Sequence, residues 1–171
     1  MKSILTISLA VLGLAFSNVH AQGKTAGEHI DDSWIHTKVK AAMVGHGSSG
    51  VNVEVYDGVV QLAGFLTGKG NKQNIIDAAS GVEGVKSVSD KLQVVAGDRS
   101  AGRVIDDNTA TARVKAALID ADLLGINVEV NRGNVLLSGF VDNDKVRQKA
   151  IDTTKAQDGV AGVIDGMDIK P

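Results

Sequence analysis

The sequence predicts an α+β protein of two tandem αββαβ domains, each a three-stranded mixed sheet covered by two helices. Residues 30–94 return as residues 105–169 at a constant offset of 75 without a gap, and 24 of these 65 positions are identical. Within each copy the spacing of apolar residues changes from helical to alternating and back. Two copies are too few for a solenoid, which needs at least three repeats. The duplication therefore indicates two small domains.

Residues 1–21 have the pattern of a secretory signal peptide. Lys2 precedes an apolar stretch, and Val19-His20-Ala21 resembles a small-residue cleavage site. We expect cleavage before Gln22, and a flexible arm over 22–29. The sequence contains no cysteine, so the mature chain would have neither a disulfide nor a lipid-modified N-terminal cysteine. These features predict a soluble periplasmic protein without a lipid anchor.

The charge balance argues against nucleic acid as a partner. The whole chain has a formal net charge of −2, and loss of Lys2 with the leader makes it −3. Neither half is basic, and aromatic residues make up only 3% of the chain, so both phosphate contacts and base-stacking platforms are scarce. No spacing of glycines resembles a phosphate-binding loop.

The first helix of each copy is predicted from one apolar stripe. In the first copy Asp32 is expected to cap the helix, with Asp31 or Ser33 as alternatives. Behind this start, apolar side chains recur at helical spacing. They are Ile35, Val39, Ala42 and Met43 in the first copy, and Ala110, Val114, Ala117 and Leu118 in the second, where Asp107 replaces Asp32.

Two strands joined by a tight turn follow each helix. Apolar residues alternate with polar ones over 51–56 and 126–131, and again around Leu62 and Leu137. The turns fall at Asp57-Gly58 and Arg132-Gly133, where glycine tolerates a positive φ. Each returning strand ends in Gly-Phe, and a glycine there suggests a bulge or a close backbone approach. These two glycines are Gly64 and Gly139.

Each copy then closes with a helix and a last strand. Gly84-Val85 and Gly159-Val160 are expected to end the second helix and lead into that strand. The expected boundaries are domain 1 over residues 30–95, a Gly/Arg/Ser linker over 96–104, and domain 2 over 105–171. Domains this small bury little surface, so each should be only modestly stable.

These motifs resemble the BON (bacterial OsmY and nodulation) domain family. The pattern Asp-x-x-Ile-x-x-x-Val-x-x-Ala begins at Asp32, followed by an alternating hairpin, Val-x-Leu-x-Gly-Phe and Gly-Val-x-x-Val. The second copy departs at Ala110 and at Gln157, so its core should be less well filled. Two such units behind a signal peptide resemble the osmotically inducible periplasmic members. The resemblance implies a non-enzymatic protein without cofactors, which associates with phospholipid and supports the envelope under stress.

No catalytic or metal site is predicted. His29, His36 and His46 cluster near the first helix, but the second copy lacks all three, which favours solvated histidines over a metal site. No serine stands in a nucleophile motif. Glu54 and Glu129 lie on the polar face of a strand, where pairing on the sheet surface is a better explanation than acid/base chemistry.

Two groups of residues are candidates for contact with lipid. Trp34 lies at the edge of the first apolar stripe with Lys38 one turn later, a pair suited to a headgroup layer. Packing of Trp34 against the other domain or the N-terminal arm is an equally good explanation. The second group is Lys145, Arg147 and Lys149, although interleaved aspartates favour a solvated face.

The function predicted from the sequence is that of a periplasmic stress or maintenance protein with weak affinity for phospholipid surfaces. The alternative is a holdase for unfolded exported proteins, because a three-stranded sheet has unpaired edges that could accept a client strand. Against the holdase, Lys91 and Asp168 in the last strands are expected to protect those edges. No small-molecule substrate is predicted.

Overall fold

The structure is a computed structural model that describes residues 31–67, 70–96 and 101–171. Domain 1 consists of α1 (Asp32–Ala42), β1 (Asn52–Tyr56), β2 (Val59–Thr67), α2 (Gly70–Ser80) and β3 (Ser87–Val95). Domain 2 repeats this order with α3 (Ala101–Asp120), β4 (Asn127–Asn131), β5 (Asn134–Val141), α4 (Asp144–Lys155) and β6 (Gly162–Ile169). The predicted signal peptide and the arm over 22–29 lie outside the described residues.

Each domain has one mixed three-stranded sheet, which confirms the predicted fold class. The strand orders are β1-β2-β3 and β4-β5-β6. The hairpin strands pair antiparallel, with Val55 opposite Val60 and Val130 opposite Val135. The last strand of each domain then pairs parallel to the central strand. That parallel pairing requires a crossover connection, which α2 and α4 provide.

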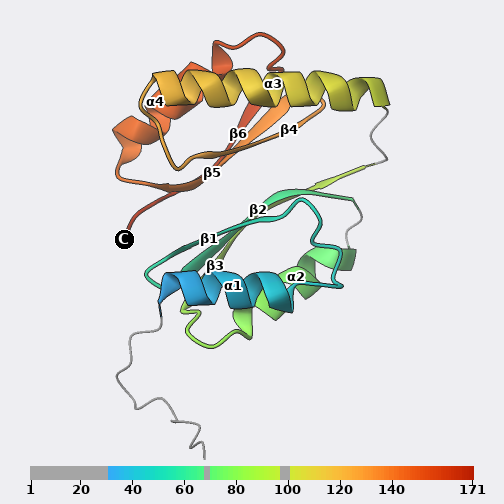
Figure 1. Ribbon diagram of the computed structural model, residues 1–171, viewed down its shortest axis with the longest axis vertical. Coiled ribbons are helices and arrows are strands. Elements are labelled where there is room, and N and C mark those ends of the chain that lie inside the picture. Colours follow the sequence, from blue (N-terminus) through green and yellow to red (C-terminus); the bar gives the residue numbers. More distant parts are fainter. Residues whose placement is uncertain (1–30, 68–69, 97–100) are drawn as a thin grey trace, which may run out of the picture.

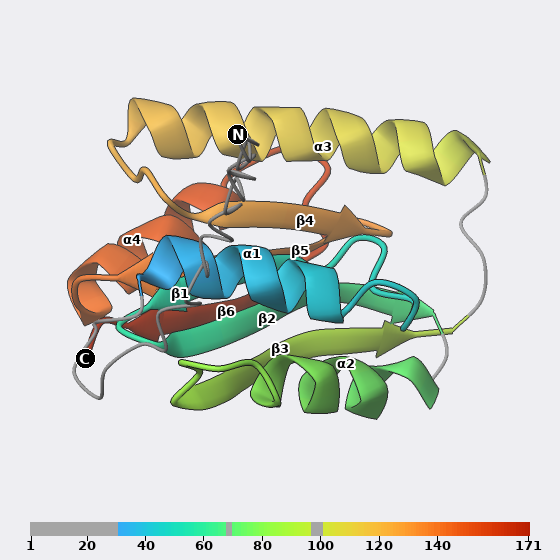
Figure 2. The same cartoon turned by 60° about the horizontal axis from the view of Figure 1, so that its bottom comes forward.

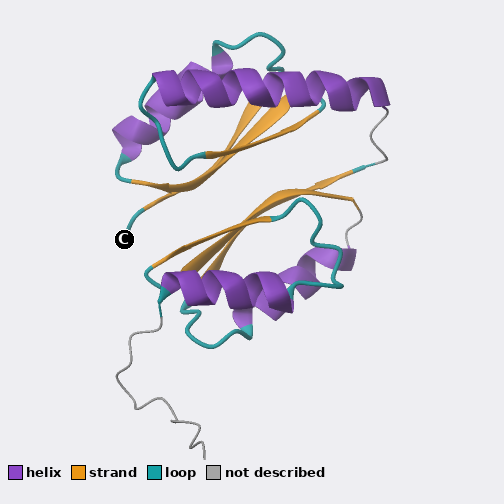
Figure 3. Ribbon diagram, in the orientation of Figure 1, coloured by secondary structure: helices purple, strands orange, loops and turns teal. Residues whose placement is uncertain are grey.

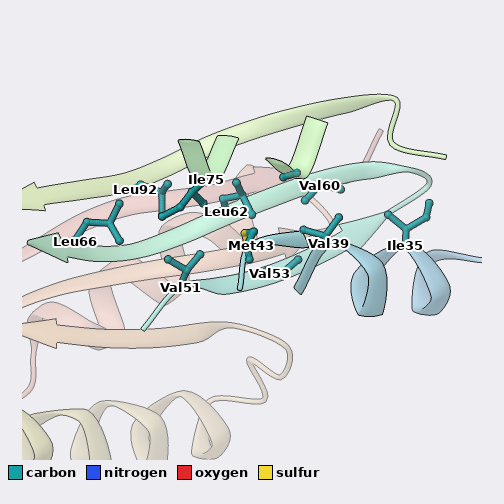
Figure 4. Packing of buried hydrophobic residues seen from close by; sticks show 11 residues of the cluster. Ile35, Val39, Met43, Val51, Val53, Val60, Leu62, Leu66, Ile75 and Leu92 are labelled. Atoms are coloured by element: carbon teal, nitrogen blue, oxygen red, sulfur yellow. The ribbon is translucent and has the colours of Figure 1, made fainter. Parts of the chain in front are cut away.

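The core of each domain lies between the two helices and one face of the sheet. In domain 1 it is built from alternate residues of the strands and one stripe of each helix, because strand side chains repeat every second residue and helix side chains every third or fourth. Figure 4 shows these side chains meeting, from α1 and its C-cap (Ile35, Val39, Met43), the residue before β1 (Val51), β1 and β2 (Val53, Val60, Leu62, Leu66), α2 (Ile75) and β3 (Leu92).

The two domains stack through the other faces of their sheets. Figure 1 shows four layers, with the helices of domain 1 and those of domain 2 on opposite outer sides and the two sheets between them. Figure 3 shows the same layering coloured by secondary structure, and the turned view of Figure 2 shows α1 in front of the strands. A small apolar cluster joins the sheets at the centre, formed by Ala63, Phe65 and Leu136 with Val95 and Ile164 beside it. Neither sheet is therefore open to solvent on a whole face.

The turns agree with the sequence, whereas some helix boundaries do not. Asp57 and Gly58 have φ angles of 46° and 75°, and Arg132 and Gly133 have 53° and 77°, as a type I′ hairpin requires. However, α3 begins at Ala101, inside the stretch 96–104 expected to be a linker. The helices α2 and α4 end at Ser80 and Lys155, so the glycines expected to end them lie in the following loops instead. Those glycines are Gly84 and Gly159, with φ angles of 88° and 86°.

The glycine near the end of each central strand allows a close backbone approach, as predicted. A Cβ on Gly64 would collide with the carbonyl oxygen of Gly50, and one on Gly139 would lie 2.7 Å from the carbonyl oxygen of Gly125. Their φ angles of 152° and 119° are also in the region that favours glycine. The loop after the first helix of each domain therefore packs directly on the central strand.

Candidate functional surfaces

The interface between the sheets contains a reciprocal pair of hydrogen bonds. Asn52 Nδ2 donates to Glu129 Oε1 at 2.8 Å, and Asn127 Nδ2 donates to Glu54 Oε1 at the same distance. Glu129 Oε2 also accepts from the backbone N–H of Phe65 at 3.3 Å. The glutamates were expected to pair on the surface of their own sheets. They instead hold the two domains together, because the polar faces of the strands meet each other.

A second polar cluster at this interface has no symmetric counterpart. Gln61 is only 1% exposed, and its amide exchanges hydrogen bonds with the backbone of Gly139. Asp168 accepts from Gln61 Nε2 at 2.7 Å and from Ser89 Oγ at 2.6 Å, and its other oxygen pairs with Lys91 Nζ at 2.8 Å. In domain 2 the position of Gln61 is taken by Leu136, which is apolar and buried.

The partners of Asp168 determine its ionisation. Burial by itself would raise the pKa of Asp168, but the hydrogen bonds from Lys91, Ser89 and Gln61 and the charge of Lys91 outweigh burial and hold that pKa below its ordinary value. Asp168 and Lys91 were expected to protect the sheet edges. They point instead into the domain interface, where they pair with each other.

The aspartate shared by the first helices fastens the helix to the hairpin. Asp32 Oδ1 and Oδ2 accept from the backbone N–H groups of Gly58 and Asp57 at 2.8 and 2.7 Å. Asp107 does the same for Gly133 and Arg132, both at 3.0 Å. The helix cap expected at Asp32 is Asp31, whose side chain accepts from Ser33 N. Asp107 caps nothing, because α3 begins six residues earlier.

The basic residues of α4 are largely engaged within domain 2. Arg147 Nε pairs with Asp165 at 2.6 Å, in the same place as the Lys72–Asp90 pair of domain 1 at 2.7 Å. Lys149 Nζ donates to the carbonyl oxygen of Ala121 at 2.6 Å. Lys145 is exposed. This face therefore presents less free positive charge than its sequence suggests.

Trp34 lies half-buried against the core of its own domain. Lys38 Nζ is 5.3 Å from the centre of the indole ring, so the two residues do form a pair. Both are on α1, whereas Lys145, Arg147 and Lys149 are on α4. Because α1 and α4 belong to opposite outer layers, the two predicted lipid-contacting groups do not share one surface (Figure 1).

The structure also has an apolar patch that the sequence analysis did not identify. Ile119 and Leu124 are 62% and 71% exposed, at the end of α3 and in the loop that follows. They line a groove of about 370 Å³ together with Lys115 and Leu123. The sequence does contain one sign of this patch, because the apolar Leu124 is aligned with the polar Ser49 of the first copy.

The helices in the described part of the chain are too short or too polar to span a bilayer.

Metal-binding side chains do not gather in groups of three or more within the described part of the chain. His36 and His46 are on α1 and in the loop after it, and His29 lies outside the described residues. The sequence and this geometry together define a protein of two tandem α+β domains whose sheets face each other across a polar interface.

Comparison with known proteins gives the family. The BON domain matches residues 31–96 and 106–171, so the chain belongs to the BON domain family. It is 36% identical over 163 residues to osmotically-inducible protein Y of Escherichia coli (strain K12), covering 91% of this chain and 81% of that protein. The resemblance predicted from the sequence is thereby confirmed.

Two solved structures of CdsD, a structural protein of the type III secretion system of Chlamydia trachomatis, also align with this chain. One is its C-terminal domain, with 14% identity, a TM-score of 0.34, and coverage of 83% of this chain and 68% of that one. The other has 13% identity, a TM-score of 0.35, and coverage of 82% and 64%. Similarity at this level has no bearing on function.

Proposed function

We propose that this chain is a non-enzymatic periplasmic protein of envelope stress or maintenance that associates weakly and reversibly with phospholipid surfaces. The signal-peptide pattern supports the periplasm, and the osmotically-inducible relative supports a link to osmotic stress. The observation that carries the membrane part is the exposed apolar patch of Ile119 and Leu124 beside Lys115. Exposed apolar side chains next to lysine suit the boundary between headgroups and acyl chains.

The expected binding is weak for a physical reason. Full burial of one leucine side chain contributes about 1.5–3 kcal/mol, and each lysine near anionic lipid adds about 1 kcal/mol. Two apolar side chains and Lys115 therefore give a marginal affinity that depends on salt. Screening over a Debye length of about 8 Å at physiological ionic strength reduces the lysine contribution further.

Co-sedimentation of the mature protein with phosphatidylcholine vesicles of rising phosphatidylglycerol content tests this site. Leu124→Asp is expected to weaken binding about tenfold or more, the loss expected from one buried leucine. The matched control is Ser49→Asp, which places the same charge at the equivalent exposed position of domain 1. Equal binding by Leu124→Asp and the unaltered protein would show that this patch is not the contact.

The same titration decides on the α1 alternative, because Trp34 is the only tryptophan. If α1 makes the contact, Trp34 emission shifts to the blue on binding to the vesicles. Trp34→Ala or Lys38→Ala then weakens vesicle binding. If the end of α3 makes the contact, emission is unchanged, since Trp34 is on α1, which lies in the opposite outer layer (Figure 1). Lys145→Ala is expected to have less effect than Leu124→Asp in that case.

A holdase is the second candidate, and the sheet edges favour it. β3 and β6 are edge strands of nine and eight residues, and Val94 and Ile169 on them are exposed. Exposed edge strands accept added strands through backbone hydrogen bonds. A holdase would suppress aggregation of an unrelated unfolding protein without lipid. Val94→Lys with Ile169→Lys should then abolish suppression while Leu124→Asp retains it, and no suppression by the unaltered protein eliminates this candidate.

A further inference from the structure

Domain 2 contains a groove whose lining residues differ from those at the equivalent positions of domain 1. It has a volume of about 590 Å³ and lies between α3, the β4–β5 turn and the loop before β6. Its floor is made of small residues, with Ala110 from α3 and Gly159 and Ala161 from the loop. A Cβ on Gly159 would be 3.7 Å from that of Ala110, so little but backbone separates these elements.

Three replacements between the copies open this groove. Thr109, Ala110 and Ala161 stand where domain 1 has Trp34, Ile35 and Lys86. In domain 1 the Lys86 side chain crosses the hairpin turn, because a Cβ on Gly58 would lie 3.0 Å from its Cγ. Lys86 Nζ then pairs with Asp57 at 2.7 Å.

The turn residue changes charge along with these replacements. Arg132 in domain 2 takes the place of Asp57. With Ala161 opposite instead of a lysine, the closing ion pair cannot form, and a guanidinium stands at the mouth of the groove. Both residues have a positive φ, 46° for Asp57 and 53° for Arg132, so the two turns share one backbone conformation.

The groove brings together unpaired charges of both signs. Arg113 and Arg132 contribute the positive charges, and Asp106 and Asp158 the negative ones. Within the described residues, none of these four side chains forms an ion pair or a hydrogen bond. Asp107, the fifth charged group, is occupied by the turn N–H groups. Elsewhere the comparable cations Lys72, Lys86, Lys91 and Arg147 are all paired.

These charges select a class of ligand. A guanidinium forms bidentate hydrogen bonds with phosphate or carboxylate, and an aspartate attracts an ammonium group. With Asp107 included, the lining carries a formal net charge of −1, which disfavours a simple polyanion. A molecule with both charges satisfies both sets of side chains. The volume lies within the range of small-molecule sites.

We propose that this groove binds a small zwitterion of the phosphoethanolamine type, with its phosphate at Arg113 and Arg132 and its ammonium group at Asp106 and Asp158. The ligand is either a free solute or the headgroup of a phosphatidylethanolamine. The site goes beyond the proposed function, because it is distinct from the Ile119–Leu124 patch. The exposed charges predict a dissociation constant in the millimolar range.

The test follows backbone amide shifts of the labelled mature protein by NMR during titration with phosphoethanolamine, inorganic phosphate or ethanolamine. Saturable shifts at Gly133 and Gly159 are expected with phosphoethanolamine, and binding at least tenfold weaker with either fragment. No saturable shift, or equally tight binding of inorganic phosphate, overturns the proposal.

The variants come from the chain itself. Arg132→Asp with Ala161→Lys recreates the Asp57–Lys86 pair of domain 1, so it closes the groove while preserving a turn that the protein already forms. This double variant is expected to lose binding at least tenfold, and Lys40→Ala, which removes an exposed cation at the end of α1 in domain 1, to retain it. An unchanged melting temperature separates closure from misfolding, and a folded double variant that still binds refutes the site.

Two further experiments identify the source of the ligand and distinguish this site from the membrane contact of the proposed function. Competition by phosphatidylethanolamine-containing vesicles, but not by phosphatidylcholine alone, identifies the headgroup as the ligand, and absence of competition identifies the free solute. Leu124→Asp should leave phosphoethanolamine binding unchanged, while the double variant should leave binding to phosphatidylglycerol vesicles unchanged. Failure of either proposal is thus visible without the other.

Discussion

Replacing Asp168 with asparagine should loosen the contact between the two domains. Its carboxylate accepts from Gln61 and Ser89 and pairs with Lys91, and its side chain is 26% exposed. Asparagine keeps the shape, but it removes the charge and puts an N–H₂ donor where an oxygen accepted. Gln61, itself buried, then keeps only its contacts with Gly139.

The magnitude follows from these partners. Hydrogen bonds to a charged group contribute about 1.5–3 kcal/mol, and partial exposure with retention of one oxygen reduces the loss to about 2 kcal/mol in all. For a chain of this size, that free energy corresponds to a fall in melting temperature of about 4–8 °C. Urea denaturation and calorimetry measure both. The control is Asp142→Asn, which breaks the exposed pair with Lys170 in the same domain.

The effect should depend on pH in a defined direction. Because the pKa of Asp168 is lowered in the folded state, its contribution is present above the unfolded value of about 3.9 and is lost as the pH falls through the folded pKa. The unfolding free energy of the unaltered protein should therefore fall more steeply below about pH 4 than that of Asp168→Asn. Destabilisation of Asp168→Asn no larger than that of Asp142→Asn at neutral pH would refute this account of the interface.

Three other substitutions probe the fold. Asp107→Ala should destabilise domain 2 by about 2–3 kcal/mol in chemical denaturation, because two turn N–H groups lose their acceptor; an effect as small as that of the exposed Asp106→Ala would contradict the helix-to-hairpin fastening. Gly139→Ala should cost about 3 kcal/mol or more through its positive φ and the Gly125 oxygen, and a melting temperature near that of the unaltered protein would disprove the close approach. Glu129→Ala should destabilise more than Glu54→Ala, because Glu129 also accepts from Phe65, and equal melting curves would count against that third bond.

Much of each domain follows from local patterns in the sequence. The helical stripe of Ile35 and Val39, the alternation around Val53 and the turn glycine Gly58 each depend on the geometry of a few neighbouring residues. The internal repeat supports this prediction, because the same pattern recurs at an offset of 75 residues in the second copy. The cores therefore lie where the apolar spacing placed them.

The candidate sites were less accessible from the sequence, because they depend on contacts between distant residues. The sequence of a strand does not show what its polar residues face, so the contact of Glu54 with the second sheet could not be predicted. Arg147 is predicted as part of a basic patch because its partner Asp165 is 18 residues away in the sequence. The groove at Arg132 likewise depends on three segments that meet only in the folded domain.

The two αββαβ units, their cores and their hairpin turns can be predicted from local sequence, since they follow from the period of side-chain directions along helix and strand. The stacking of the two sheets, and the contacts by which Asp32 and Asp107 fasten a helix to a turn, became known from the folded chain alone. The same holds for the positions of α1 with Trp34 and of the α4 cations in opposite outer layers (Figure 1). Hydrogen bonds and ion pairs of side chains act over a few ångströms and do not depend on separation along the sequence, so their partners are fixed by packing and not by a local pattern.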